Sequence, residues 1–164
     1  MPRWDFRLHG TIVDEETFAC VTELETRQAA RLQYAVSMLT VFRNRARSIL
    51  TSEEAAEQLA EVISSLVRDT DVIHVVPGGG AVRVLLVGGE LEDLRAIIQR
   101  IIAEVSLYMF EGASTLVVKI GGACYPATAG NSQELLRQAD TLAEEARREA
   151  SGASTYRLSE RAGA

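Results

Sequence analysis

The chain has 164 residues, of which 47% are hydrophobic and 24% charged, a balance typical of a globular protein that buries a core within one domain. Its formal net charge of −6 argues against electrostatic binding of a nucleic-acid polymer over a broad surface. No apolar run reaches the roughly 18 residues of a membrane span, and residues 1–10 lack the apolar core of a secretory signal. We therefore expect a single cytoplasmic domain over residues 1–164, with its core between about residues 5 and 158.

Two cysteines, Cys20 and Cys124, are too few for a disulfide framework and do not have the spacing of metal ligands. We predict that both are buried, reduced thiols and that the chain holds no metal. The run RNRAR at 43–47 either meets a phosphate or an acidic partner, or is a solvated segment.

The first half of the chain alternates between helical and strand patterns. Residues 14–31 place acids early and arginines late, which suits the helix dipole and predicts a helix. The apolar, β-branched run 32–42 predicts a buried strand. Residues 51–71 begin with Ser52 as an N-cap followed by acids and continue with one apolar face, which predicts a second helix.

The second half begins with two short apolar runs joined by PGGG, which predicts an antiparallel hairpin. A helix, a strand and a last helix follow, and the tail after Gly152 is expected to add a short edge strand. The predicted ranges are strands 72–76 and 81–88, helix 89–110, strand 114–126 and helix 131–152.

Strands interleaved with helices, two of them in a hairpin, predict an α+β palm with a ferredoxin-like, antiparallel-containing central sheet flanked by helices. The three glycines of the hairpin do not form a phosphate-binding loop of the Walker type, because no lysine follows them. They do not form a dinucleotide fingerprint either, since they lead into a strand. Taken alone they indicate a tight turn.

Four segments in order resemble the GGDEF domains, the diguanylate cyclase fold of bacterial signalling. IGGACYP at 120–126 and ELLRQADTLAEEAR at 134–147 are similar to the family's IGVAxYP and ELLxxADxALYxAK. SLVRDTD at 65–71 resembles the segment that carries the family's RxxD motif, and LLVG resembles the strand after the signature. ELETRQAARLQYAVSMLTVF resembles the approach to the family's first strand. The resemblance covers nearly the whole chain.

In that resemblance PGGGAVRVLL stands in the place of the family's YGGDEFAVLL. Gly78 and Gly79 keep the two glycines of the turn. Gly80, Ala81 and Val82 stand where the family has Asp, Glu and Phe, so the signature hairpin is degenerate. One extra residue also lies between Asp71 and Gly78.

The family joins two GTP molecules, and metal ions held by carboxylates of the hairpin and of the first strand support this chemistry. Here the hairpin has no acid, and no Asp or Glu occurs between Glu25 and Glu53. FRNRARSILTSE, from residue 42, also departs from the family's guanine-reading FKxxND. We therefore expect no catalytic residue, no metal or cofactor, weak or absent GTP binding, and no enzyme activity.

The motif RDTD, from Arg68 to Asp71, matches the RxxD of the family's inhibitory site, which the resemblance implies would bind cyclic di-GMP. A guanidinium suits a guanine edge or phosphate, and a carboxylate accepts from guanine N–H groups. The alternative is an exposed ion pair at a helix end.

Several other residues have a structural role as the simplest explanation. We expect Lys119 to face solvent on its strand, His74 to be a core or edge residue, and His9 to lie in a loop without a metal partner. The patch Tyr108, Met109 and Phe110 either closes the core or meets a partner.

The sequence thus predicts an inactive GGDEF-like domain that acts as a regulatory or protein-interaction module through a protein partner or self-association. The alternative is a cyclic di-GMP receptor that uses Arg68 and Asp71. A remote alternative is a nucleotide cyclase with relocated acids, such as Glu90 or Glu92.

Overall fold

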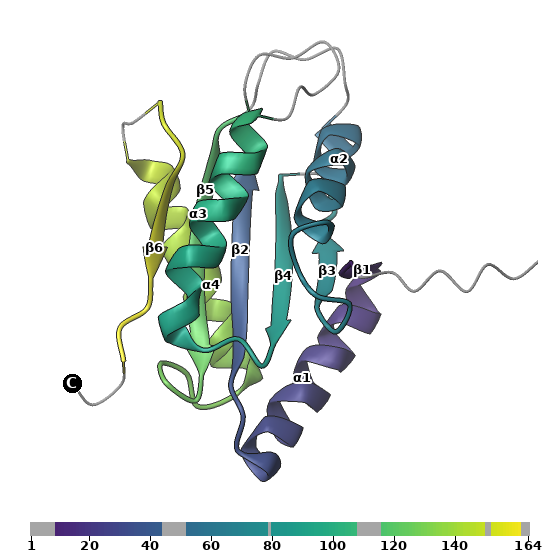
Figure 1. Cartoon of the computed structure of the whole chain (residues 1–164), viewed down its shortest axis with the longest axis vertical. Helices are drawn as coiled ribbons and strands as arrows, with labels where there is room; N and C mark the ends of the chain where they lie inside the picture. The colour runs from purple at the N-terminus through teal and green to yellow at the C-terminus, as the bar shows by residue number, and fades with distance from the viewer. Residues whose placement is uncertain (1–8, 44–51, 79, 108–115, 150–151, 162–164) are drawn as a thin grey trace, which may run out of the picture.

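The computed structural model describes residues 9–43, 52–78, 80–107, 116–149 and 152–161. They form six strands and four helices that build one central sheet with helices on both faces (Figure 1). In chain order the elements are β1 (Thr11–Val13), α1 (Glu15–Leu32), β2 (Val36–Arg43), α2 (Ser52–Ser64), β3 (Val72–Val75), β4 (Ala81–Val87), α3 (Leu91–Leu107), β5 (Val118–Tyr125), α4 (Ser132–Arg148) and β6 (Thr155–Leu158).

The strands lie in the order β1-β3-β4-β2-β5-β6. The four central strands pair antiparallel, whereas β1 joins β3 and β6 joins β5 in parallel at the two edges. Parallel edges on an antiparallel centre require helical crossovers, which the four helices supply. The predicted α+β palm is confirmed.

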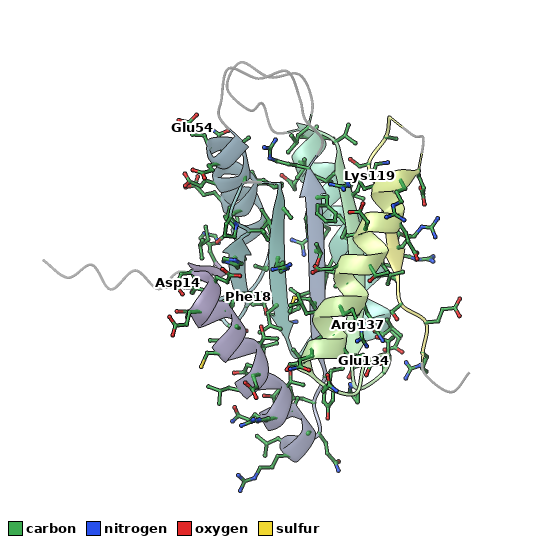
Figure 2. All side chains as sticks on the ribbon, turned by 180° about the vertical axis from the view of Figure 1, so that it is seen from behind. Asp14, Phe18, Glu54, Lys119, Glu134 and Arg137 are labelled. Carbon is green, nitrogen blue, oxygen red and sulfur yellow. The ribbon has the colours of Figure 1, made fainter. Side chains whose placement is uncertain are left out.

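Helices α2 and α3 cover one face of the sheet, and α1 and α4 cover the other (Figures 1 and 2). The larger core lies under α2 and α3, where alternate residues of β2 and β4 meet the apolar faces of both helices. Its fully buried members include Leu39, Leu59, Ile63, Val84, Leu94, Ile98 and Ile101. A smaller core on the other face packs Phe18 of α1 and Leu135 of α4 onto Met38 and Leu85.

The predicted helices and strands are present, including the tail strand. Strand β2 begins at Val36 and not at residue 32, because α1 continues to Leu32, and α2 ends well before its predicted end. Helix α2 stops at Ser64 and not near residue 71, and the hydroxyls of Ser64 and Ser65 at this end both donate to backbone carbonyls. The Ser64 hydroxyl donates to Gly10 O at 2.6 Å, and the Ser65 hydroxyl donates to Val62 O at 2.7 Å. Serine hydroxyls that bond the backbone locally compete with helix continuation.

Strand β1 was not predicted from the sequence. It has three residues and pairs with β3 through Thr11↔Val72, Ile12↔Ile73 and Val13↔His74. A strand this short shows no readable alternation, and its position depends on a partner about sixty residues later in the chain.

Candidate functional site at the hairpin end of the sheet

The hairpin between β3 and β4 is built on a glycine turn, as predicted. Val75 pairs with Val82, and Val76 N donates to Ala81 O at 3.0 Å. Gly78 has a φ of 94°, a conformation that favours glycine. The hairpin is tied to β2 by the Arg43 N–H, which donates to Gly80 O at 3.2 Å. Gly79 lies outside the described residues.

The positions after the turn carry apolar side chains that pack into the fold. Ala81 is 5% exposed and Val82 is fully buried in the larger core. Neither side chain has an oxygen. Across the residues that the structure describes, no three His, Cys, Asp or Glu side chains come together in a group able to hold a metal ion.

A cleft of about 470 Å³ lies beside the hairpin, on the sheet face that α4 covers. Helix α1 crosses the opposite end of this face, as Figure 2 shows. Strands β2 and β4 provide the floor, and α4 provides one wall. The lining residues are Thr40, Phe42, Val76, Ala81, Arg83, Asp140, Thr141, Glu144, Glu145 and Arg148.

Three polar side chains from three elements meet at the floor of this cleft. Arg83 of β4 donates to Asp140 of α4 in a forked pair, from Nε to Oδ1 at 3.3 Å and from Nη2 to Oδ2 at 2.8 Å. The hydroxyl of Thr40, on β2, donates to the same Oδ1 at 2.6 Å. The side chains of Arg83 and Asp140 are 21% and 34% exposed, so their pair is partly shielded from water.

This cluster depends on how closely α4 approaches the sheet. Gly121 of β5 lies beside Thr40, and a Cβ there would be 2.2 Å from both Ala139 O and Ala143 N. Only glycine permits that approach. Sequence reasoning missed the cluster, although a charged Arg83 inside the apolar run AVRVLLV was a visible signal for it.

Arginines neutralise the carboxylates of the α4 wall. The Glu144 carboxylate pairs with Arg147 at 2.8 Å and with Arg148 at 3.7 Å. Arg147 also places its guanidinium 4.8 Å from the centre of the Phe42 ring, in a cation–π contact. Glu145 pairs with Arg157 of β6 at 3.4 Å.

The predicted pair Arg68 and Asp71 lies at the turn between α2 and β3. Asp71 is 3% exposed, and its carboxylate accepts from Arg68 N at 2.8 Å and from Val87 N at 2.9 Å. Burial raises the pKa of Asp71, and these two backbone hydrogen bonds oppose that rise. The Arg68 side chain is exposed. Asp71 therefore joins the turn to the end of β4.

Lys119 was expected to face solvent, and this was wrong. It is 5% exposed, and its Nζ donates to Ala153 O at 2.8 Å and to Thr155 Oγ1 at 3.1 Å. Figure 2 shows Lys119 near the end of α4 opposite to Glu134. The side chain is enclosed because β6 adds to β5 at this point and brings polar acceptors with it.

The cysteine prediction holds for one residue and fails for the other. Cys124 is buried on β5, and burial raises the pKa of its thiol. Cys20 is exposed, because it falls on the outer side of α1 and not on the side that buries Phe18. Both are free thiols, as expected.

His74 is a core residue, as expected. It is 4% exposed and stacks on the ring of Phe18 with centroids 5.5 Å apart. Its Nδ1 lies 3.2 Å from Val13 O, whereas Nε2 has no partner among the described residues. His9 is exposed ahead of β1.

Several other predicted residues lie away from the cleft or outside the described ranges. Glu90 and Glu92 follow β4, whereas the hairpin precedes it, so the whole strand separates them from the turn. Glu92 pairs with Arg161. Arg45, Arg47 and the patch Tyr108, Met109 and Phe110 lie outside the described residues.

An antiparallel centre with parallel edges and a glycine hairpin between two central strands are the features of a palm-like α+β domain. Residues 49–153 match the family described as "Diguanylate cyclase, GGDEF domain". The chain belongs to the GGDEF family, a class of domain in bacterial signalling. No curated protein sequence matches the chain significantly.

Solved GGDEF domains have the same fold. The GGDEF domain of PA1120 (YfiN or TpbB) from Pseudomonas aeruginosa is 23% identical with a TM-score of 0.75, over 90% of this chain and 96% of that one. The FimX GGDEF domain from the same organism is 17% identical with a TM-score of 0.77, over 89% and 94%. The GGDEF domain of DgcB from Caulobacter crescentus, in complex with c-di-GMP, is 12% identical with a TM-score of 0.68, over 95% and 98%.

None of the helices in the described ranges combines the length and apolar character that crossing a membrane requires.

Proposed function

We propose that this chain is a catalytically inactive GGDEF domain that works as a regulatory or protein-interaction module. The observation that carries the proposal is the side-chain chemistry of the signature hairpin. Gly78 and Gly80 flank the turn, and Ala81 and Val82 follow with buried, apolar side chains. Metal-assisted joining of two nucleotides needs hard oxygen ligands, and these positions offer none.

The strand beside the hairpin supports the same proposal. Strand β2 pairs with β4 through Phe42↔Ala81 and Thr40↔Arg83, so it approaches the hairpin from the side where the family's second acid is expected. Its sequence, VSMLTVFR, contains no Asp or Glu. Metal ions and positioned cations supply much of the stabilisation in phosphoryl transfer, and losing such support costs several kcal/mol of barrier.

Turnover of GTP tests this proposal directly. The purified chain is incubated with GTP and Mg²⁺, and separately with Mn²⁺, and the products are separated by chromatography beside an active cyclase as a positive control. We expect no cyclic di-GMP above the background of a protein-free sample. Clear formation of the product would overturn the proposal.

The second candidate, a cyclic di-GMP receptor, remains a prediction and has less support. Arg68 is exposed and able to meet a ligand, but both carboxylate oxygens of Asp71 already accept backbone hydrogen bonds. A ligand that used Asp71 would have to displace one of these bonds in a buried site. The structure of DgcB with c-di-GMP is the reason to keep the candidate.

Calorimetry separates the two candidates. Cyclic di-GMP is titrated into the wild-type chain and into Arg68→Ala, with Arg95→Ala on the exposed side of α3 as a matched control. The receptor function requires micromolar binding by the wild type and by the control, and its loss in Arg68→Ala. If the wild type gives no heat, the receptor function is excluded and the interaction module remains.

A further inference from the structure

The cleft beside the hairpin contains an arginine whose hydrogen-bonding capacity is only half used. Asp140 occupies the Nε–Nη2 edge of Arg83 and so fixes the plane of its guanidinium. A guanidinium has a second fork, between Nη1 and Nη2, at its outer end. Within the described residues nothing bonds Nη1, and it is not among the fully buried polar atoms that lack a partner. Arg83 lines the cleft with a side chain that is 21% exposed, and Nη1 keeps some accessible surface there.

We propose that this cleft is a docking site for an acidic side chain of a partner protein, whose carboxylate binds the outer fork of Arg83. The inference rests on the proposed function, since it names the contact that an interaction module would use. A planar carboxylate matches a guanidinium fork in two parallel hydrogen bonds. Thr40 and Asp140 act as positioning residues, because they hold the arginine and leave its outer end open.

The walls of the cleft favour a single carboxylate over a phosphate chain. Asp140, Glu144 and Glu145 all line the cleft, and arginines already pair with each of them. One incoming negative charge meets a site that is close to neutral. A triphosphate would bring several negative charges, and the arginines of the site, which are already paired with its carboxylates, would not balance them.

The remaining surface suits the chain that would carry such a carboxylate. Phe42, Val76 and Ala81 add apolar area beside Arg83, and the exposed Thr141 offers a hydroxyl from α4. Apolar side chains on both sides of a partner's acid would rest on this area. Arginines that are held in one orientation and bordered by apolar contacts are common among the residues that dominate interfaces.

A pair of short peptides tests the proposal on the whole chain. Blocked Leu-Glu-Leu and Leu-Gln-Leu peptides are titrated into the protein, and binding is followed by NMR through the side-chain Nε–H signal of Arg83. We expect saturable, millimolar binding of the Glu peptide and at least about tenfold weaker binding of the Gln peptide. Equal binding of the two peptides would contradict the proposal.

Variants locate the contact. Arg83→Lys keeps the charge but removes the fork, and it should weaken the Glu peptide by roughly tenfold. Thr141→Glu places a carboxylate in the cleft from an exposed helical position, so the variant should still fold. It should weaken binding of the Glu peptide by roughly fivefold or more, because one nearby negative charge repels the ligand. Arg95→Met, on the exposed side of α3 and outside the cleft lining, serves as the matched control and should bind as the wild type does. Unchanged binding in both Arg83→Lys and Thr141→Glu contradicts the proposal.

Inorganic tripolyphosphate and GTP are titrated in the same way, as competing candidates for the ligand of the cleft. Tighter binding of either one than of the Glu peptide, lost in Arg83→Lys, assigns the cleft to phosphates and overturns the carboxylate assignment. Failure of the docking site leaves the proposed lack of cyclase activity untouched, because the product assay measures that lack separately.

Discussion

At the scale of single residues, Asp71 shows how a motif that resembles a ligand site serves the fold. Its carboxylate accepts hydrogen bonds from two backbone N–H groups, one in the turn between α2 and β3 and one at the end of β4. Asp71 is 3% exposed, and the two hydrogen bonds that it accepts are partly buried. Unsatisfied buried donors cost about 1–3 kcal/mol each. The residue therefore has a structural reason to be acidic that involves no ligand.

Replacement of Asp71 should make this cost measurable. We expect Asp71→Ala to lower the free energy of unfolding by about 2–4 kcal/mol, because both N–H groups lose their acceptor. Urea denaturation followed by circular dichroism gives the value. Asp69→Ala, at an exposed neighbour in the same turn, is the control and should change stability by less than about 0.5 kcal/mol. Equal effects of the two variants would contradict the role given to Asp71.

The pH dependence of the same residue has a defined sign. Burial raises the pKa of Asp71 in the folded state above its ordinary value of 3.8. The folded chain then binds more protons than the unfolded chain between these two values, so this contribution to stability is full below pH 3.8 and is lost as the pH rises through the folded pKa. The stability of the wild type minus that of Asp71→Asn should accordingly fall as the pH rises from about 4. A difference that rises with pH would refute the assignment.

Lys119 gives a second residue-scale prediction. It is the only lysine in the sequence and is 5% exposed, with its Nζ bonded inside the β5–β6 region. We expect an amine-reactive ester to label Lys119 at least about tenfold more slowly in the native chain than in urea, since labelling requires local opening. Peptide mass mapping gives both rates. Equal rates would show that the amine is accessible.

At the scale of elements, the contact between α4 and the sheet depends on Gly121. A Cβ there would meet backbone atoms of α4 at 2.2 Å, and backbone does not move aside as a side-chain end does. We expect Gly121→Ala to destabilise the chain by about 3 kcal/mol or more, at the upper end of overpacking costs. Gly130→Ala is the control, because its nearest neighbour is the flexible Glu134 carboxylate at 3.5 Å. Thermal unfolding of both variants compares them.

The elements themselves were largely predictable from the sequence, and the failures have physical causes. The long helices and the hairpin have strong apolar periodicity, so the sequence predicted these elements correctly. The predicted end of α2 was wrong, since the helix stops at Ser64, whose hydroxyl bonds Gly10 O. Strand β1 was missed because three residues carry no period. Both depend on contacts between segments far apart in sequence.

The candidate site was predictable only in part, for a similar reason. The missing acids of the hairpin are visible in PGGGAV alone. The cluster of Thr40, Arg83 and Asp140 joins β2, β4 and α4, so only the register of the sheet and the approach of the helix bring it together. The burial of Lys119 likewise follows from the addition of β6 to the sheet edge.

At the scale of the whole molecule, restoring the two acids of the hairpin should not produce cyclase activity. In the double variant Gly80→Asp with Ala81→Glu, the hairpin regains its two acids. Strand β2 still has no carboxylate, and Arg83 still lies on the floor of the cleft. We expect no cyclic di-GMP from this variant in the GTP assay, because metal-assisted transfer needs ligands from both strands. Turnover by the double variant would show that the hairpin alone had been limiting.

The β3–β4 hairpin is also expected to form early when the chain folds. Its pairs, such as Val75↔Val82, join residues close in sequence, whereas Val36↔Tyr125 in the β2–β5 pair and Thr11↔Val72 in the β1–β3 pair each span much of the chain. Closing long loops before any contact forms is slow, so local pairs tend to form first. The glycine turn is therefore expected to be part of the folding nucleus. Gly78 would then influence the rate of folding whether or not the domain catalyses a reaction.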